Sequence, residues 1–84
     1  MDELERETLV AIFQEPVPTT IEWEAIEDLF EAIGCAVVDD DGERITFELR
    51  GAIGSFERPP IRQMARRYTV LAARDYLTRL GVTP

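Results

Sequence analysis

The apolar residues of this chain change their spacing at Gly34, and this change separates a helix from the strands that follow it. Before Gly34, apolar side chains recur every three or four residues, which is the pattern of one face of an amphipathic helix. They are Ile26, Leu29, Phe30 and Ile33. After it, residues 44–50 alternate, so a strand built from them places every second side chain on one face. That apolar face carries Ile45, Phe47 and Leu49. The two periods together predict a mixed fold in which the helix stripe packs on the strand face.

Two further helices are predicted, one near each end of the chain. Residues 2–15 repeat apolar side chains at helical spacing, and the prolines that follow at 16 and 18 end the segment. Residues 70–80 do the same, and Gly81 closes that helix. The buried side of this last helix is expected to carry Val70, Ala73, Leu77 and Leu80.

Two short strands are predicted on either side of the strand at 44–50, over residues 35–39 and 52–57. Asp40-Asp41-Gly42 favours a turn between the first two strands, and Arg50-Gly51 favours a tight hairpin between the last two. The predicted order is therefore α-α-β-β-β-α. We expect an α+β fold with a three-stranded antiparallel sheet packed on helices, in one small domain of 84 residues.

Three local features complete the structural expectations. Thr19 or Thr20 is placed to cap the second helix, and Thr19 with Glu22 has the spacing of a capping box. Trp23 is expected to cover the seam between the first two helices, because large aromatic side chains dominate small cores. Cys35 lies before an apolar run and is expected to be buried and inert.

Charge divides the chain into an acidic and a basic half. Residues 1–43 hold 14 acids and one arginine, a charge of −13, whereas residues 44–84 hold eight arginines and three acids, a charge of +5. The total is −8, and no lysine is present. Arginine binds phosphate and carboxylate through a planar two-pronged fork, so the basic half is expected to meet an anionic ligand or an acidic partner. The candidate contacts are Arg44, Arg50, Arg58, Arg62, Arg66, Arg67 and Tyr68.

Two interpretations of these arginines remain open at this point. A sheet with arginines on one face, edged by a basic connector at 61–68, can follow a phosphate backbone, and Tyr68 adds a stacking surface. Alternatively, the arginines pair with the acids of the same chain, because charge pairing on surfaces is common and needs no ligand.

The composition argues against several classes of site. A chain with no histidine and one cysteine lacks the ligands of a standard zinc site and cannot form an internal disulfide. The run Asp39-Asp40-Asp41-Gly42 lacks the spacing of a calcium loop, and no phosphate-binding or dinucleotide glycine pattern is present. We therefore expect no metal and no cofactor. No apolar run approaches about 18 residues, so we expect no membrane association and a cytoplasmic protein.

Four segments carry a resemblance to a known family: Thr20–Glu27, Leu29–Gly34, the strand pair 44–58, and Tyr76–Val82. Together they resemble the HicA family of toxin–antitoxin ribonucleases, the mRNA interferases. The resemblance implies a compact fold like that of double-stranded-RNA-binding domains, with a helix before the three-stranded sheet and another after it. It also implies a single domain over residues 1–84, with a core at 19–84 and an extra N-terminal helix and linker at 1–18.

The family's catalytic group is a histidine in a Gly-Ser-His element at the start of the second strand. The matching stretch here is Gly42-Glu43-Arg44, so Arg44 stands in the position of the histidine. Arginine cannot take a proton from a ribose hydroxyl at neutral pH, so no catalytic residue is carried over. The carboxylates near this position are Glu43, Glu48 and Glu57.

The partners that the resemblance implies are RNA and a HicB-type antitoxin protein. The first hypothesis is a HicA-like protein whose arginines bind RNA, a HicB-type antitoxin or both. The second is a non-catalytic protein-interaction module whose arginines pair with acidic groups.

Overall fold

The computed structural model describes residues 1–60 and 63–84, and its elements follow the predicted order. They are α1 (Glu3–Ile12), α2 (Trp23–Ala32), β1 (Ala36–Asp40), β2 (Arg44–Leu49), β3 (Ala52–Glu57) and α3 (Arg67–Arg79). The strands form one sheet in the order β1-β2-β3, and both pairings are antiparallel. The predicted α+β fold with a three-stranded antiparallel sheet is confirmed. Its likeness to double-stranded-RNA-binding domains stays a prediction.

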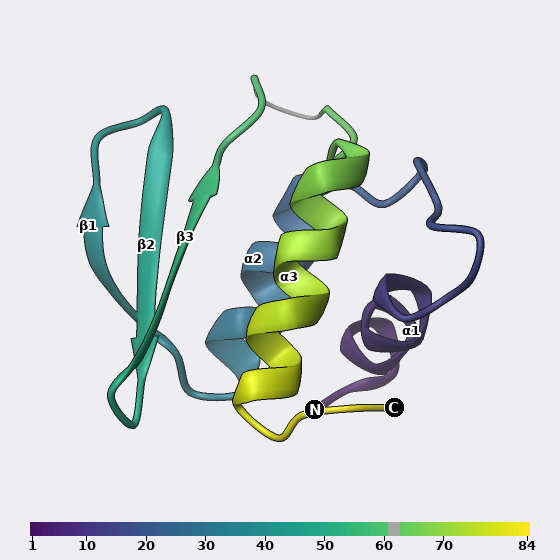
Figure 1. Cartoon of the computed structure of the whole chain (residues 1–84), viewed down its shortest axis with the longest axis horizontal. Coiled ribbons are helices and arrows are strands. Elements are labelled where there is room, and N and C mark those ends of the chain that lie inside the picture. Colours follow the sequence, from purple (N-terminus) through teal and green to yellow (C-terminus); the bar gives the residue numbers. More distant parts are fainter. Residues whose placement is uncertain (61–62) are drawn as a thin grey trace.

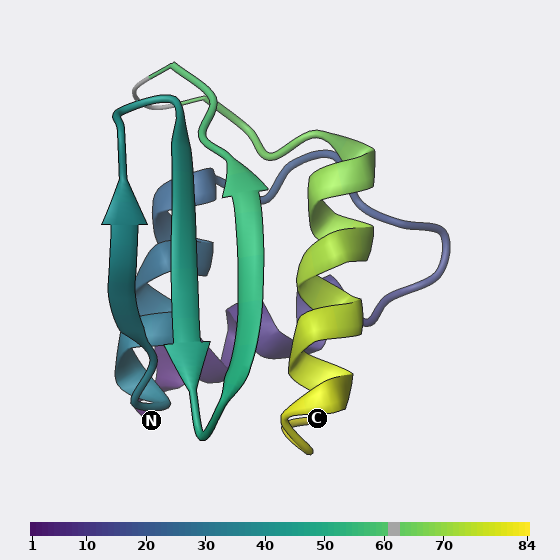
Figure 2. The ribbon, with the colours of Figure 1, turned by 60° about the vertical axis from the view of Figure 1, so that its left-hand side comes forward.

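The elements form three layers (Figure 1). The sheet is the first layer, α2 and α3 cover one of its faces, and α1 lies beyond them on the side away from the sheet. Figure 2 shows α2 behind the strands and α3 alongside β3. The far helix α1 contacts both α2 and α3. One face of the sheet is therefore left for solvent.

Phe30 of α2 lies at the centre of the core. Its ring is 5.0 Å from Phe47, 5.3 Å from Phe56 and 5.5 Å from Tyr76, measured between ring centroids. All four side chains are buried, and Ile45 is buried beside them. The predicted contact between the helix stripe and the alternating strand is confirmed. Tyr76 was not among the residues predicted to be buried, although it is the largest of the fully buried side chains in the described part of the chain.

Tyr76 fits into the core because β3 has a glycine opposite it. A Cβ atom added to Gly54 would lie 2.8 Å from the ring of Tyr76, so only glycine leaves room for the ring there. The phenol donates a hydrogen bond of 3.0 Å to the carbonyl oxygen of Ala52. Cys35 is buried as predicted, with its sulfur 3.9 Å from the same hydroxyl, and burial raises the pKa of its thiol.

The predicted start of α2 is wrong. Glu22 is the N-cap residue, and its side chain makes no capping hydrogen bond, so neither Thr19 nor Thr20 caps the helix. The reason is a pairing between distant segments, in which the amide of Ala65 donates to the carbonyl of Ile21 at 2.7 Å. This pairing keeps the backbone before Trp23 extended. The capping box is instead at α1, where Asp2 and Glu5 bond each other's backbone amides.

Trp23 packs toward the sheet, whereas the sequence placed it at the seam between the first two helices. Its ring centroid lies 5.8 Å from that of Phe56, and the residue is only 2% exposed. Its indole Nε1 is buried and has no hydrogen-bond partner among the residues that the structure describes.

The two edges of the sheet differ. At the β3 edge, α3 lies alongside the strand, and its Tyr76 and Arg79 donate to the carbonyl oxygens of Ala52 and Ile53. All five residues of β1 are exposed, and its register with β2 shifts between Val37 and Asp39, which leaves a bulge at Val38.

Candidate functional site

Arg58, a predicted ligand contact, is held by acids of the same chain. It follows β3 on the side that faces α2, and its Nε lies 3.2 Å from Glu27 while its Nη1 lies 2.7 Å from Asp40. Hydrogen bonds to these two carboxylates raise the pKa of Arg58, and the bond from Arg58 holds the pKa of Asp40 below its ordinary value. Arg58 therefore ties β1 to α2 and does not lie on the solvent face of the sheet.

Arg50 lies at the opposite end of β2 from Arg44. It occupies the hairpin turn with Gly51, and both residues have a positive φ, as two-residue hairpin turns of the favoured type require. Its Nη2 donates to the carbonyl oxygen of Leu80 at 3.2 Å, which satisfies a backbone acceptor at the end of α3. Arg62, a further candidate, lies outside the described residues.

Four of the candidates lie toward the opposite end of the sheet, where β3 ends and α3 begins. The structure places Arg44 and Tyr68 against one carboxylate, that of Glu57, and Arg66 lines the same small hollow as Tyr68. We name Arg44, Glu57, Arg66 and Tyr68 the sheet-end cluster. Arg44 is paired with Glu57 across the strands, with 4.0 Å between Nη1 and Oε1. Tyr68 donates a hydrogen bond from its hydroxyl to Glu57. The fourth candidate, Arg67, is the exposed first residue of α3.

The sheet-end cluster is open to solvent. Arg44 and Glu57 have side chains that are 56% and 58% exposed, and Tyr68 is 52% exposed. Glu57 lines two hollows. One, of about 600 Å³, also includes Arg44 and the turn at 41–43, and a smaller one, of about 90 Å³, also includes Arg66 and Tyr68. The hydrogen bond to Glu57 raises the pKa of the Tyr68 hydroxyl, and the charge of Arg66 acts in the opposite direction. Tyr68 is therefore neutral and held in place.

The solvent face of the sheet is not uniformly basic. Thr46 and Ser55 face each other across β2 and β3, with 2.7 Å between their hydroxyl oxygens. Glu48 accepts a hydrogen bond from the amide of Gly51, and Ile53 is 57% exposed. Among the strand residues, the predicted arginine-bearing face therefore contains Arg44 alone, and Arg66 and Arg67 lie at the start of α3.

The chemistry available at the sheet-end cluster is binding of anions and donation of hydrogen bonds. The guanidinium groups can bind a phosphate through two hydrogen bonds, and they cannot accept a proton. Glu57 is the carboxylate that contacts both Arg44 and Tyr68, so it holds these two side chains together. Within residues 1–60 and 63–84, no group of three acidic or cysteine side chains could hold a metal ion. In the same residues, no helix is long and apolar enough to cross a membrane.

Comparisons with models of known families, with curated proteins and with solved structures gave no match.

Proposed function

We propose that this chain is an RNA-binding protein of HicA-like build, which contacts phosphates through Arg44, Arg66 and Arg67. The single observation that carries the proposal is the position of Tyr68. Its half-exposed ring is fixed by Glu57 beside Arg44 and Arg66, so a base can stack on the ring while the neighbouring phosphates meet guanidinium groups. A stacking ring among arginine forks is a common way to hold single-stranded RNA without reading its sequence.

The proposed activity is binding rather than cleavage. The residue in the position of the family's histidine is Arg44, which can bind a phosphate and cannot act as a general base. A HicB-type antitoxin, the partner that the resemblance implies, is proposed to cover the same surface. The net charge of −8 opposes every polyanion at long range, so we expect weak binding that falls steeply with salt.

A second candidate function is a non-catalytic protein-interaction module. It is favoured by the arginines whose partners are internal. Arg58 is bound by Glu27 and Asp40, and Arg74 binds Glu15 together with the carbonyl oxygens of Ile12 and Gln14. These groups act within the fold, so they leave only part of the basic half for a ligand.

A matched pair of variants tests the RNA proposal. Arg67→Gln removes a charge at the proposed surface, and Arg6→Gln removes the same charge from α1, the helix that lies beyond α2 and α3 from the sheet. Binding of a fluorescent single-stranded RNA is measured across a range of salt concentrations. We expect Arg67→Gln to lower the magnitude of the log–log salt slope by about 0.7, and Arg6→Gln to leave the slope unchanged.

Thermal unfolding of both variants should stay close to that of the parent, because both arginines are exposed. An absence of salt-sensitive RNA binding by the parent would exclude the proposal. Equal effects of the two variants would also contradict it, because they would show a long-range effect of net charge with no local contact.

A further inference from the structure

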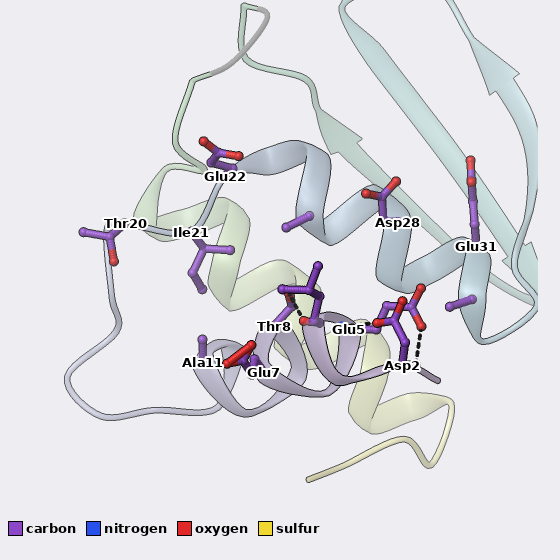
Figure 3. Close-up of a pocket in the computed structure, with 13 residues that line it drawn as sticks. Asp2, Glu5, Glu7, Thr8, Ala11, Thr20, Ile21, Glu22, Asp28 and Glu31 are labelled. Atoms are coloured by element: carbon purple, nitrogen blue, oxygen red, sulfur yellow. Dashed lines mark hydrogen bonds between the residues drawn. The ribbon is translucent and has the colours of Figure 1, made fainter.

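A groove lies between α1 and α2, on the side of the molecule away from the sheet. Figure 3 shows the two helices and the extended segment before α2 around a hollow of about 820 Å³. Small or aliphatic side chains line much of it, including Ala11, Ile21, Ala25 and Ala32. Leu4 also lines the groove and is 74% exposed, the most exposed of the large apolar residues that the structure describes. The groove therefore offers an apolar surface that no part of the described chain covers.

All the charged side chains that line the groove are acids. The carboxylates are Asp2, Glu5, Glu7, Glu22, Asp28 and Glu31. No arginine lines the groove, and none of the six forms an ion pair with another described residue. The ion pairs of the fold use other acids, such as Glu27 and Glu57. The charge of the groove is thus uncompensated by the described residues, and it repels nucleic acid and other anions.

The shape of the groove favours a helical occupant. Its two walls are helices, and the alanines between them allow a third helix to approach to the 8–10 Å at which helices pack. Acids stand on both walls, with Asp2, Glu5 and Glu7 near or on α1 and Asp28 and Glu31 on α2. A helix in the groove can therefore cover the apolar residues with one face, while its basic side chains reach carboxylates on both walls.

We propose that this groove binds a basic amphipathic helix of a partner protein. The aliphatic residues of that helix cover Leu4 and the alanines, and its arginines or lysines pair with the carboxylates of both rims. This is the helix-in-groove mode of recognition, with charge complementarity setting the choice of partner. The proposal does not depend on the RNA surface, because the groove and the sheet-end cluster share no residue, so either can fail without the other.

The test uses a synthetic helical peptide with leucines at every third or fourth position and arginines on both sides of them. A second peptide carries glutamates in place of the arginines. Binding to the full chain is measured by fluorescence anisotropy and should occur with the arginine peptide only. A parent protein that binds neither peptide, or both equally, overturns the proposal.

Two double variants with the same change of charge locate the binding. Glu7→Gln with Glu31→Gln alters the groove, whereas Glu3→Gln with Glu24→Gln alters α1 and α2 outside it. The groove variant should weaken peptide binding by about two- to thirtyfold, the range expected for two exposed ion pairs. The control variant should bind like the parent. Equal weakening by both variants means a general effect of net charge and contradicts the proposal.

The oligomeric state distinguishes a second copy of this chain from a separate partner. Leu4→Gln leaves the fold intact, because the side chain is mostly in solvent, and it should weaken peptide binding. The parent should sediment as a monomer at every concentration. A dimer that Leu4→Gln abolishes would show that the groove takes another copy of the chain, and this result would overturn the proposal of a distinct partner.

Discussion

A single methyl group at Gly54 should destabilise the protein, because it meets a ring that cannot move away. In Gly54→Ala, the new Cβ would lie 2.8, 2.9 and 3.0 Å from three carbon atoms of Tyr76, closer than the 3.4 Å at which ordinary contacts begin. The ring is held between Phe30 and Phe56, and its hydroxyl is tied to Ala52. Either the strand or the helix must therefore shift.

The magnitude follows from two opposing effects. Overpacking of a well-packed core costs about 1–3 kcal/mol, whereas replacing glycine by alanine gains about 0.4–1 kcal/mol by restricting the unfolded chain. Because the new Cβ meets three ring atoms of Tyr76 at once, we expect an overpacking cost in the upper part of its range. The net loss in the free energy of unfolding is then about 1–2 kcal/mol. That is a large share of the roughly 4–12 kcal/mol expected for a domain of this length.

Urea unfolding followed by the fluorescence of Trp23 measures the loss. The midpoint should fall while the slope with denaturant stays unchanged. The same substitution in a Tyr76→Leu background removes the ring that the methyl group meets, so Gly54→Ala should then cost little. Two results would refute the proposed clash. One is a free energy of unfolding for Gly54→Ala within about 0.3 kcal/mol of that of the parent. The other is an equal loss with and without the Tyr76 ring, because mutations at independent sites add to within about 0.3 kcal/mol.

Two further predictions concern charged groups. Arg58→Gln should lower the melting temperature at neutral pH, because Glu27 and Asp40 lose their shared partner. The pKa of Asp40 lies below its ordinary 3.8 in the folded protein, so this stabilisation is present above pH 3.8 and is lost as pH falls through the lowered pKa. The melting temperatures of parent and variant should therefore converge in acid, and a constant gap would contradict the assignment. Purified protein should also cleave RNA far more weakly than a histidine-bearing HicA-like protein, because Arg44 cannot accept a proton. Metal-independent cleavage that Glu57→Gln abolishes would show this prediction to be wrong and would identify the base.

Much of the fold could be predicted because its signals are local. The alternation at 44–50 and the Arg50-Gly51 turn fix the strand pairing, since residues equally distant from the turn must face each other. This counting alone pairs Arg44 with Glu57, as the structure does. The same alternation puts Arg58 on the side of Phe56, which is the buried side of β3. The sequence therefore already indicated that Arg58 does not lie on the solvent face.

The missed features depend on contacts between distant segments. The burial of Tyr76 requires a glycine on β3, and nothing near residue 76 indicates this. The late start of α2 depends on the pairing of Ile21 with Ala65 across the whole fold. The last helix begins earlier than predicted, so Arg67 and Tyr68 are helical rather than part of the connector. The groove was missed because a charged helix face is indistinguishable, in sequence, from one that only meets water.

The exposed strand β1 is the edge at which a second copy of the chain could add to the sheet. Its free edge would otherwise be a template for another chain, and Val37 and Val38 would favour that contact. The bulge at Val38 interrupts the regular spacing that an incoming strand needs, and Asp39 adds a carboxylate to the exposed strand. Because α3 blocks the other edge, growth of the sheet from one molecule to the next is opposed on both sides. The bulge and the acid of β1 thus oppose fibrous aggregation of the folded chain, in addition to any role in recognition.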